Sequence, residues 1–176
     1  MFEGIKKKIA HYILRKKYLR KDIKPTAFNG IISSAHNFFI LMPKDEKDFY
    51  HSLDILKYYL IHKKNITLFL PEHRRALIPE NDKYKTVVFQ SELKRRFNLP
   101  EKKLVDTLLG REFEVVIDLN RGEEVFFSTV ANIVKSKIRI GFAKELSDRY
   151  YNIEIAEKQS NPEVAYRNYL NYLKMF

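Results

Sequence analysis

A short run of alternating charges, Pro43–Asp48, contains the side chains best placed to do chemistry. It follows an apolar run, Phe38–Met42, that is typical of a buried strand. Open α/β sheets bind ligands at the carboxyl ends of their strands. A carboxylate in this loop can act as a general base toward a sugar hydroxyl. The alternative is structural, because Asp45 is a good helix N-cap and Asp48, three residues later, resembles a capping box.

Phosphate-binding loops are missing from the sequence. Neither G-x-G-x-x-G nor G-x-x-x-x-G-K-[ST] occurs, and none of the five glycines lies directly after the first apolar run, where a phosphate-binding loop would be expected. They are Gly4, Gly30, Gly110, Gly122 and Gly141. Backbone cannot approach a pyrophosphate closely where every residue carries a Cβ. The sequence therefore argues against a dinucleotide or P-loop nucleotide site.

Metal and nucleophile sites lack support as well. The chain has no cysteine, which excludes thiolate ligands, disulfides and a cysteine nucleophile. No H-E-x-x-H spacing or carboxylate cluster joins the histidines. The five are His11, His36, His51, His62 and His73. His51, Ser52 and Asp54 lie close in sequence, but on one helix they point in different directions, whereas a triad converges from separate elements. We expect no metal and no cofactor.

Positive charge is concentrated at the N-terminus. Residues 1–24 hold nine basic and two acidic side chains, whereas the remaining 152 residues hold 24 basic and 20 acidic ones. The basic residues of this arm are Lys6, Lys7, Lys8, Arg15, Lys16, Lys17, Arg20, Lys21 and Lys24. The rest of the chain is thus a mildly basic globular domain.

The arm has the spacing of an amphipathic helix that ends before Pro25. One face collects Phe2, Ile5, Ile9, Tyr12, Ile13 and Leu19. This face can pack on its own domain or on a partner, or lie on an anionic membrane with the lysines at the headgroups. Binding to nucleic acid is disfavoured, because the body has no second basic cluster.

The body alternates between apolar runs and helical patterns. We expect strands at 38–42, 65–70, 84–89, 113–119 and 137–142, with a further strand at 150–156. We expect helices at 48–62, 91–97, 100–109 and 123–134, and a last helix opened by Asn161 and Pro162.

Strands that are apolar throughout and are separated by helices indicate a parallel sheet covered on both faces. The sequence therefore predicts an α/β fold: a doubly wound, mostly parallel, Rossmann-like sheet over residues 30–176, preceded by the basic arm. At 176 residues one domain is expected. No apolar run reaches the ~18–20 residues of a spanning helix, so a cytoplasmic protein, at most peripheral to the inner face of a membrane, is expected.

Four strings, taken in order, resemble the N-terminal half of family 9 glycosyltransferases, the lipopolysaccharide heptosyltransferase group. The strings are Lys47–Leu56, Phe113–Gly122, Ile138–Phe142 and Tyr150–Asn152. The segment Asn161–Leu173 is similar to the helix that leads into the second domain of those enzymes. The resemblance covers Phe38 to the C-terminus.

The resemblance implies one half of a GT-B-type fold, the half that binds a lipid-linked sugar acceptor, with no metal. Asp48 matches the Asp that is the presumed base of the family. The acceptor site is then expected at Lys44, Asp45, Lys47, Asn120 and Arg121, with Lys44 or Lys47 holding an anionic acceptor.

Two departures shape the expected function. Lys47 stands where the family has glycine, so this loop cannot bend as tightly. The sequence ends near the point where the nucleotide-sugar domain would begin, so we expect a domain that is inactive alone and binds a glycan, a lipid-linked sugar or a protein. The alternatives are an acceptor subunit that pairs with a separate donor-domain protein, and a peripheral membrane or scaffolding protein. A homodimer is also expected to be feasible through a residual apolar patch.

Overall fold

The computed structural model describes residues 2–19, 30–79, 82, 84–90 and 96–176. A six-stranded sheet in the order β3-β2-β1-β4-β5-β6 forms its centre, and every neighbouring pair is parallel. The strands are β1 (Asn37–Leu41), β2 (Asn65–Pro71), β3 (Tyr84–Phe89), β4 (Glu112–Asp118), β5 (Lys135–Phe142) and β6 (Ile153–Ile155). This is the doubly wound, Rossmann-like arrangement that the sequence predicts.

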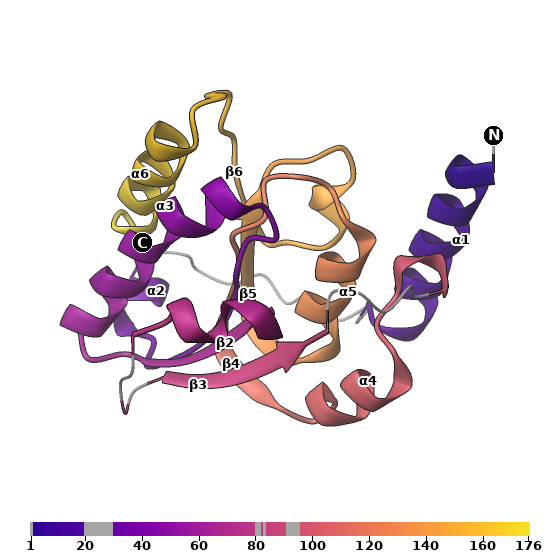
Figure 1. Cartoon of the computed structure of the whole chain (residues 1–176), viewed down its shortest axis with the longest axis horizontal. Helices are drawn as coiled ribbons and strands as arrows, with labels where there is room; N and C mark the ends of the chain where they lie inside the picture. The colour runs from indigo at the N-terminus through magenta and orange to yellow at the C-terminus, as the bar shows by residue number, and fades with distance from the viewer. Residues whose placement is uncertain (1, 20–29, 80–81, 83, 91–95) are drawn as a thin grey trace.

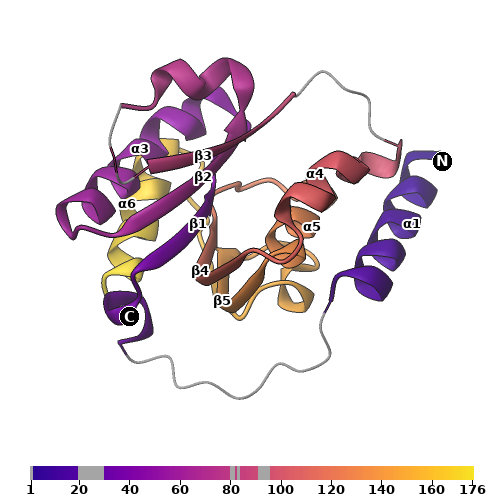
Figure 2. The same cartoon turned by 90° about the horizontal axis from the view of Figure 1, so that it is seen from below.

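Helices cover both faces of the sheet (Figure 1). The α-helices are α1 (Phe2–Lys17), α2 (Ile31–Ser34), α3 (Glu46–Ile61), α4 (Lys102–Leu108), α5 (Val125–Ile133) and α6 (Pro162–Leu173). Short 3₁₀ segments are η1 (Glu72–Leu77), η2 (Arg96–Asn98) and η3 (Ser147–Arg149). One face carries α3 and α6, whereas α4, α5 and, outermost, α1 lie on the other (Figure 2).

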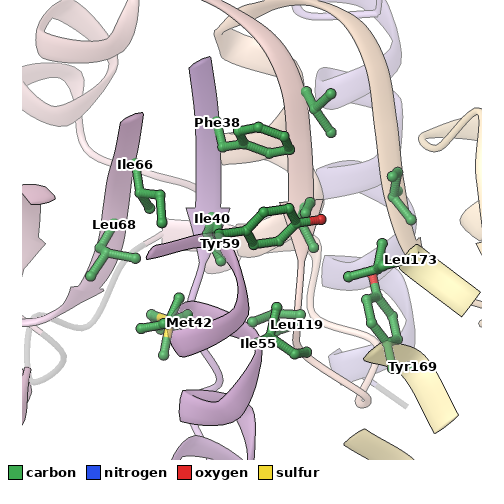
Figure 3. Close-up of a cluster of buried hydrophobic side chains, with 14 of the residues drawn as sticks. Phe38, Ile40, Met42, Ile55, Tyr59, Ile66, Leu68, Leu119, Tyr169 and Leu173 are labelled. Atoms are coloured by element: carbon green, nitrogen blue, oxygen red, sulfur yellow. The ribbon is translucent and has the colours of Figure 1, made fainter. Parts of the chain in front are cut away.

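Strand β1 shows why two layers of helices are needed. Its side chains alternate between the faces, and every one from Phe38 to Leu41 is fully buried. Phe38 and Ile40 pack with α3 and α6, where Tyr59 and Tyr169 fill the layer (Figure 3). Phe39 and Leu41 pack with α4 and α5. A strand without a polar side is typical of a central strand in a parallel sheet.

Most predicted elements lie within a few residues of their expected bounds. The helix expected at 48–62 begins two residues earlier because Asp45 caps it, and the strand expected at 137–142 already begins at Lys135. Of the helix expected at 91–97, residues 91–95 lie outside the described residues, and its end is the 3₁₀ segment η2, in which Phe97 has φ +59°. The sequence pattern does not predict α2, η1 and η3. Each is only three to six residues long, which is too short for a helical repeat of apolar residues to be recognised.

The basic arm is helical as expected, but its apolar face does not pack on the body as one surface. Ala10 and Leu14 are the buried apolar contacts, whereas Ile5, Ile9 and Tyr12 are exposed. Of the alternatives for the predicted face, packing on its own domain does not hold for these three residues. Residues 20–24, including Arg20, lie outside the described part of the chain.

Candidate functional site

The candidate site lies at the carboxyl ends of β1 and β4, where the sheet order reverses. The chain passes from β1 into α3 on one face of the sheet and from β4 into α5 on the other. Ligands of doubly wound folds bind at this switch point. The two loops are joined, because Lys44 N donates to Asn120 Oδ1 at 2.9 Å and Asn120 Nδ2 donates to the Met42 carbonyl at 3.3 Å.

Asp45 and Asp48 have separate tasks at the start of α3. The Asp45 side chain caps the helix by accepting from Asp48 N at 3.0 Å, as the structural alternative predicts. The Asp48 carboxylate instead pairs with Arg121, whose Nε lies 3.1 Å from Oδ1 and 3.2 Å from Oδ2. Capping therefore explains Asp45 and leaves the Asp48 carboxylate for the site.

Arg121 is held in place from the other side. Its Nη1 donates to the Gln159 carbonyl at 2.9 Å and to the Ser160 carbonyl at 3.4 Å. The guanidinium thus ties the loop after β4 to α3 and to the segment before α6. An arginine fixed by several acceptors holds its partner carboxylate in one orientation.

Two open cavities border the Asp48–Arg121 pair. The larger has a volume of about 560 Å³ and the smaller about 390 Å³. The larger is lined by Asp45, Lys47, Asp48, Arg121, Gly122, Phe142, Ala143, Glu157, Ser160 and Pro162. The smaller is lined by Lys44, Asp45, Glu46, Asp48, Asn120, Arg121, Gly122 and Glu124. All six residues that the sequence assigned to base or substrate binding therefore line one or both cavities.

The six side chains differ in how far contacts within the protein already occupy them. Asn120 is buried, and its amide is used up by Lys44, Met42 and Asp118, so it holds the two loops together. The Lys44 ammonium is largely exposed and pairs with Glu124 at 3.3 Å. Asp48 remains as a carboxylate with one cationic partner beside an open cavity.

The electrostatics of Asp48 suit an acceptor of hydroxyl protons. Burial raises the pKa of its carboxyl above the ordinary value, and the Arg121 guanidinium offsets only part of that rise. Its Oδ1, 3.1 Å from Arg121 Nε, is buried and has no well-aligned hydrogen bond among the described residues, and its Oδ2 accepts from Arg121 Nε at 3.2 Å. A carboxylate with unused accepting capacity and a raised pKa is a stronger base than a fully paired one.

A second buried carboxylate, Asp118, is not among the site residues predicted from the sequence. Asp118, the last residue of β4, is fully buried, and its Oδ2 accepts from Lys144 Nζ at 3.0 Å and from the Tyr151 hydroxyl at 2.6 Å. Its Oδ1 accepts from Asn120 N and Nδ2. The sequence feature that could have identified Asp118 is an aspartate at the carboxyl end of a buried strand.

Residues 6–176 match the family of unknown function DUF6913. The chain belongs to this family. No curated protein and no solved structure matches the chain. Within the DUF6913 match lie both loops of the site and residues 6–17 of α1.

The arm contacts the loop after β4 at Glu123. Lys7 Nζ lies 3.3 Å from Glu123 and 3.4 Å from Glu145, so Lys7 faces the body. All described basic residues of the arm are exposed, and besides Lys7 they are Lys6, Lys8, Arg15, Lys16 and Lys17. None of the helices in the described part of the chain is long and apolar enough to cross a membrane. Across those same residues, no group of three acidic or histidine side chains is arranged to hold a metal.

Proposed function

We propose that the switch-point site binds the hydroxyl groups of a sugar acceptor, in a domain that resembles the acceptor half of family 9 glycosyltransferases. The observation that carries this proposal is the Asp48–Arg121 pair, which borders both cavities and is locked by the Gln159 and Ser160 carbonyls. A carboxylate accepts from hydroxyls, and a guanidinium donates to sugar oxygens. Both partners of a sugar hydroxyl are thus present in one fixed unit.

The surrounding charges favour an acceptor that carries anionic groups. Lys44 and Lys47 line the cavities on exposed side chains, and both precede or open α3. Asp45 and Glu157 line the same surface, so the site is mixed in sign rather than a simple phosphate pocket. A sugar substituted with phosphate or carboxylate uses both features.

Asp48 also supports a catalytic step when a donor is presented by another domain. The acceptor hydroxyl would give its proton to Asp48, its oxygen would attack the anomeric carbon of the donor sugar, and the nucleoside diphosphate would leave with the bonding electrons. This step requires donor and acceptor at near-attack distance. We therefore propose acceptor binding as the role of this domain alone, and base catalysis as its role in a complex with a donor-domain protein.

Binding measurements with defined glycans test the proposal. Calorimetry with the phosphorylated core oligosaccharide of lipopolysaccharide is compared with calorimetry of a neutral maltooligosaccharide. The core oligosaccharide is expected to bind, and Asp48→Asn is expected to weaken binding about 10–100-fold, the range for a lost charged hydrogen bond. The purified chain with a nucleotide sugar is expected to transfer no sugar.

Asp54→Asn is the matched control. Asp54 lies on the same helix, pairs with neighbouring Lys57 at 2.8 Å and is 69% exposed, so glycan binding should not change. Equal affinity of the wild type and Asp48→Asn, or a wild type that binds neither glycan, would contradict the proposal. Sugar transfer by the chain alone would contradict its non-catalytic part.

A further inference from the structure

Helix α1 packs on the body through the face opposite its apolar stripe, which consists of Ile5, Ile9 and Tyr12. Ala10 and Leu14 are fully buried against the α4–α5 side of the body, and His11 is nearly so. Figure 2 shows α1 at the rim of the molecule, beyond α4 and α5. One side of the helix is therefore used for attachment, and the opposite side faces away from the body.

Polar contacts fix the rotation of this helix. His11 Nδ1 lies 2.6 Å from the Tyr150 hydroxyl, and His11 Nε2 lies 3.3 Å from Glu123. Lys7 lies one turn before His11 and contacts Glu123 and Glu145. Since these contacts join side chains from three separate segments to one face of α1, the outward face is defined.

The outward face carries an apolar stripe. Ile5, Ile9 and Tyr12 are 53%, 39% and 58% exposed and lie at steps of four and three residues. Lys16 continues the same row, with its Nζ 5.1 Å from the centre of the Tyr12 ring. Residues 5–16 of a helix extend about 16 Å. Exposed large apolar side chains in a row mark an interaction surface rather than scattered exposure.

Basic side chains flank this stripe. Lys6, Lys8, Arg15, Lys16 and Lys17 are all exposed. We propose that α1 lies in the plane of an anionic membrane surface, with the stripe in the interface and these cations on the headgroups. This proposal does not depend on the glycan site. A second copy of the chain is the poorer occupant, because it would bring two basic surfaces together.

The loop after β4 links α1 to the candidate site. Glu123, which meets Lys7 and His11, belongs to the same short loop as Arg121. The loop after β4 thus contacts α1 on one side and carries the ion pair of the site on the other.

A tryptophan reporter tests the orientation directly, because the chain contains no tryptophan. Ile9→Trp in the full chain is mixed with vesicles of phosphatidylcholine, with or without phosphatidylglycerol. We expect a blue shift and quenching by brominated lipid only with the anionic vesicles. Ile61→Trp is the matched control, since Ile61 is 77% exposed on α3 and should show neither change.

Co-sedimentation separates the two contributions. Lys8→Gln with Lys16→Gln is expected to weaken vesicle binding about 30-fold, on the estimate for two cations at an anionic surface. The control pair Lys85→Gln with Lys137→Gln, also exposed, is expected to bind as the wild type does. Raising salt from roughly 0.1 M to 1 M should weaken binding, because the Debye length falls from about 10 to 3 Å.

Three results would overturn the proposal: no binding to anionic vesicles, equal shifts for Ile9→Trp and Ile61→Trp, or self-association in solution that Ile9→Ser abolishes. The last would assign the stripe to a second copy. Unchanged thermal unfolding of each variant verifies that the fold is intact. Because loss of glycan binding in Asp48→Asn is measured without lipid, failure of either proposal is recognised separately.

Discussion

Two carboxylates at the same edge of the sheet, Asp118 and Asp48, have opposite surroundings. Asp118 is fully buried and accepts four hydrogen bonds, from Asn120 N and Nδ2, Lys144 Nζ and the Tyr151 hydroxyl. Asp48 is 7% exposed, pairs with one guanidinium and borders both cavities. One carboxylate has all its acceptor sites used, and the other does not.

The comparison shows that depth alone does not identify a binding residue. Asp118 is the deeper and the more heavily bonded of the two, and both properties make it a structural centre that joins β4, β5 and the η3 region. A carboxylate becomes available to a ligand when it borders open space and few protein donors bind it, and Asp48 lines both cavities with the Arg121 guanidinium as its partner.

The largest expected effect is from Asp118→Asn. Lys144, only 5% exposed, would lose its carboxylate partner, so we expect a loss of about 3–5 kcal/mol in the free energy of unfolding. Urea denaturation measures it. Adding Lys144→Met should restore much of the loss, because the amine that lost its carboxylate partner is removed. A loss below about 1 kcal/mol for Asp118→Asn would end the contrast between the two carboxylates.

Gly141→Ala probes the rigidity of the same network. A Cβ at Gly141 would lie 3.1 Å from Cδ1 and Cε1 of Tyr151, whose hydroxyl is held by Asp118. Since this ring is buried and anchored, we expect a loss of about 1–3 kcal/mol, the usual cost of overpacking. Gly122→Ala is the control, because nothing lies within 4 Å of its Cβ position. Equal stability of the two variants would mean that Tyr151 can move.

Much of this site could be predicted from sequence, because it depends on strand order. Asp48 and Arg121 follow two apolar runs, and parallel strands bring their carboxyl ends to one edge. Their ion pair could not be predicted, since it joins side chains 73 positions apart and depends on how Arg121 is held by Gln159. Lys144 was missed for the same reason: nothing near it in sequence shows that it reaches Asp118.

The arm shows the limit of periodicity. The apolar pattern identifies the stripe of Ile5, Ile9 and Tyr12, yet the helix docks through Ala10, His11 and Leu14. A small side chain such as Ala10 permits close approach, and His11 finds a hydroxyl partner in Tyr150. Periodicity measures how apolar a face is, whereas docking depends on the shape and polar groups of the surface opposite.

A third carboxylate, Glu114, extends the comparison to the amino ends of the strands. Glu114 Oε2 accepts from His36 N at 2.7 Å and Asn37 N at 3.0 Å, and these bonds hold the pKa of Glu114 below its ordinary value. Its stabilisation is therefore fully present above that ordinary pKa and is lost as pH falls through the lowered value.

Glu114→Gln is accordingly expected to lose about 1–2 kcal/mol near neutral pH, the value of charged hydrogen bonds. Its unfolding free energy should also fall less steeply in acid than that of the wild type. Urea denaturation between neutral pH and pH ~3, spanning the reference pKa of Glu, measures both. Glu112→Gln, at a largely exposed carboxylate that pairs with Lys135, should change less. An unchanged acid limb in Glu114→Gln would show that these bonds do not matter for folding.

Asp48→Asn is expected to have the smallest effect on stability. The raised pKa of Asp48 means that folding disfavours its charge, so its contribution is most favourable below the ordinary pKa and declines as pH rises through the raised value. The variant removes this cost but takes the anionic partner from Arg121, which keeps the Gln159 and Ser160 carbonyls, and the two changes should nearly cancel, within about 1 kcal/mol at neutral pH. Urea denaturation at several pH values measures both the net change and the lost pH dependence. A destabilisation as large as that of Asp118→Asn would make Asp48 a second structural carboxylate, because a residue kept for a ligand can be neutralised without weakening the fold.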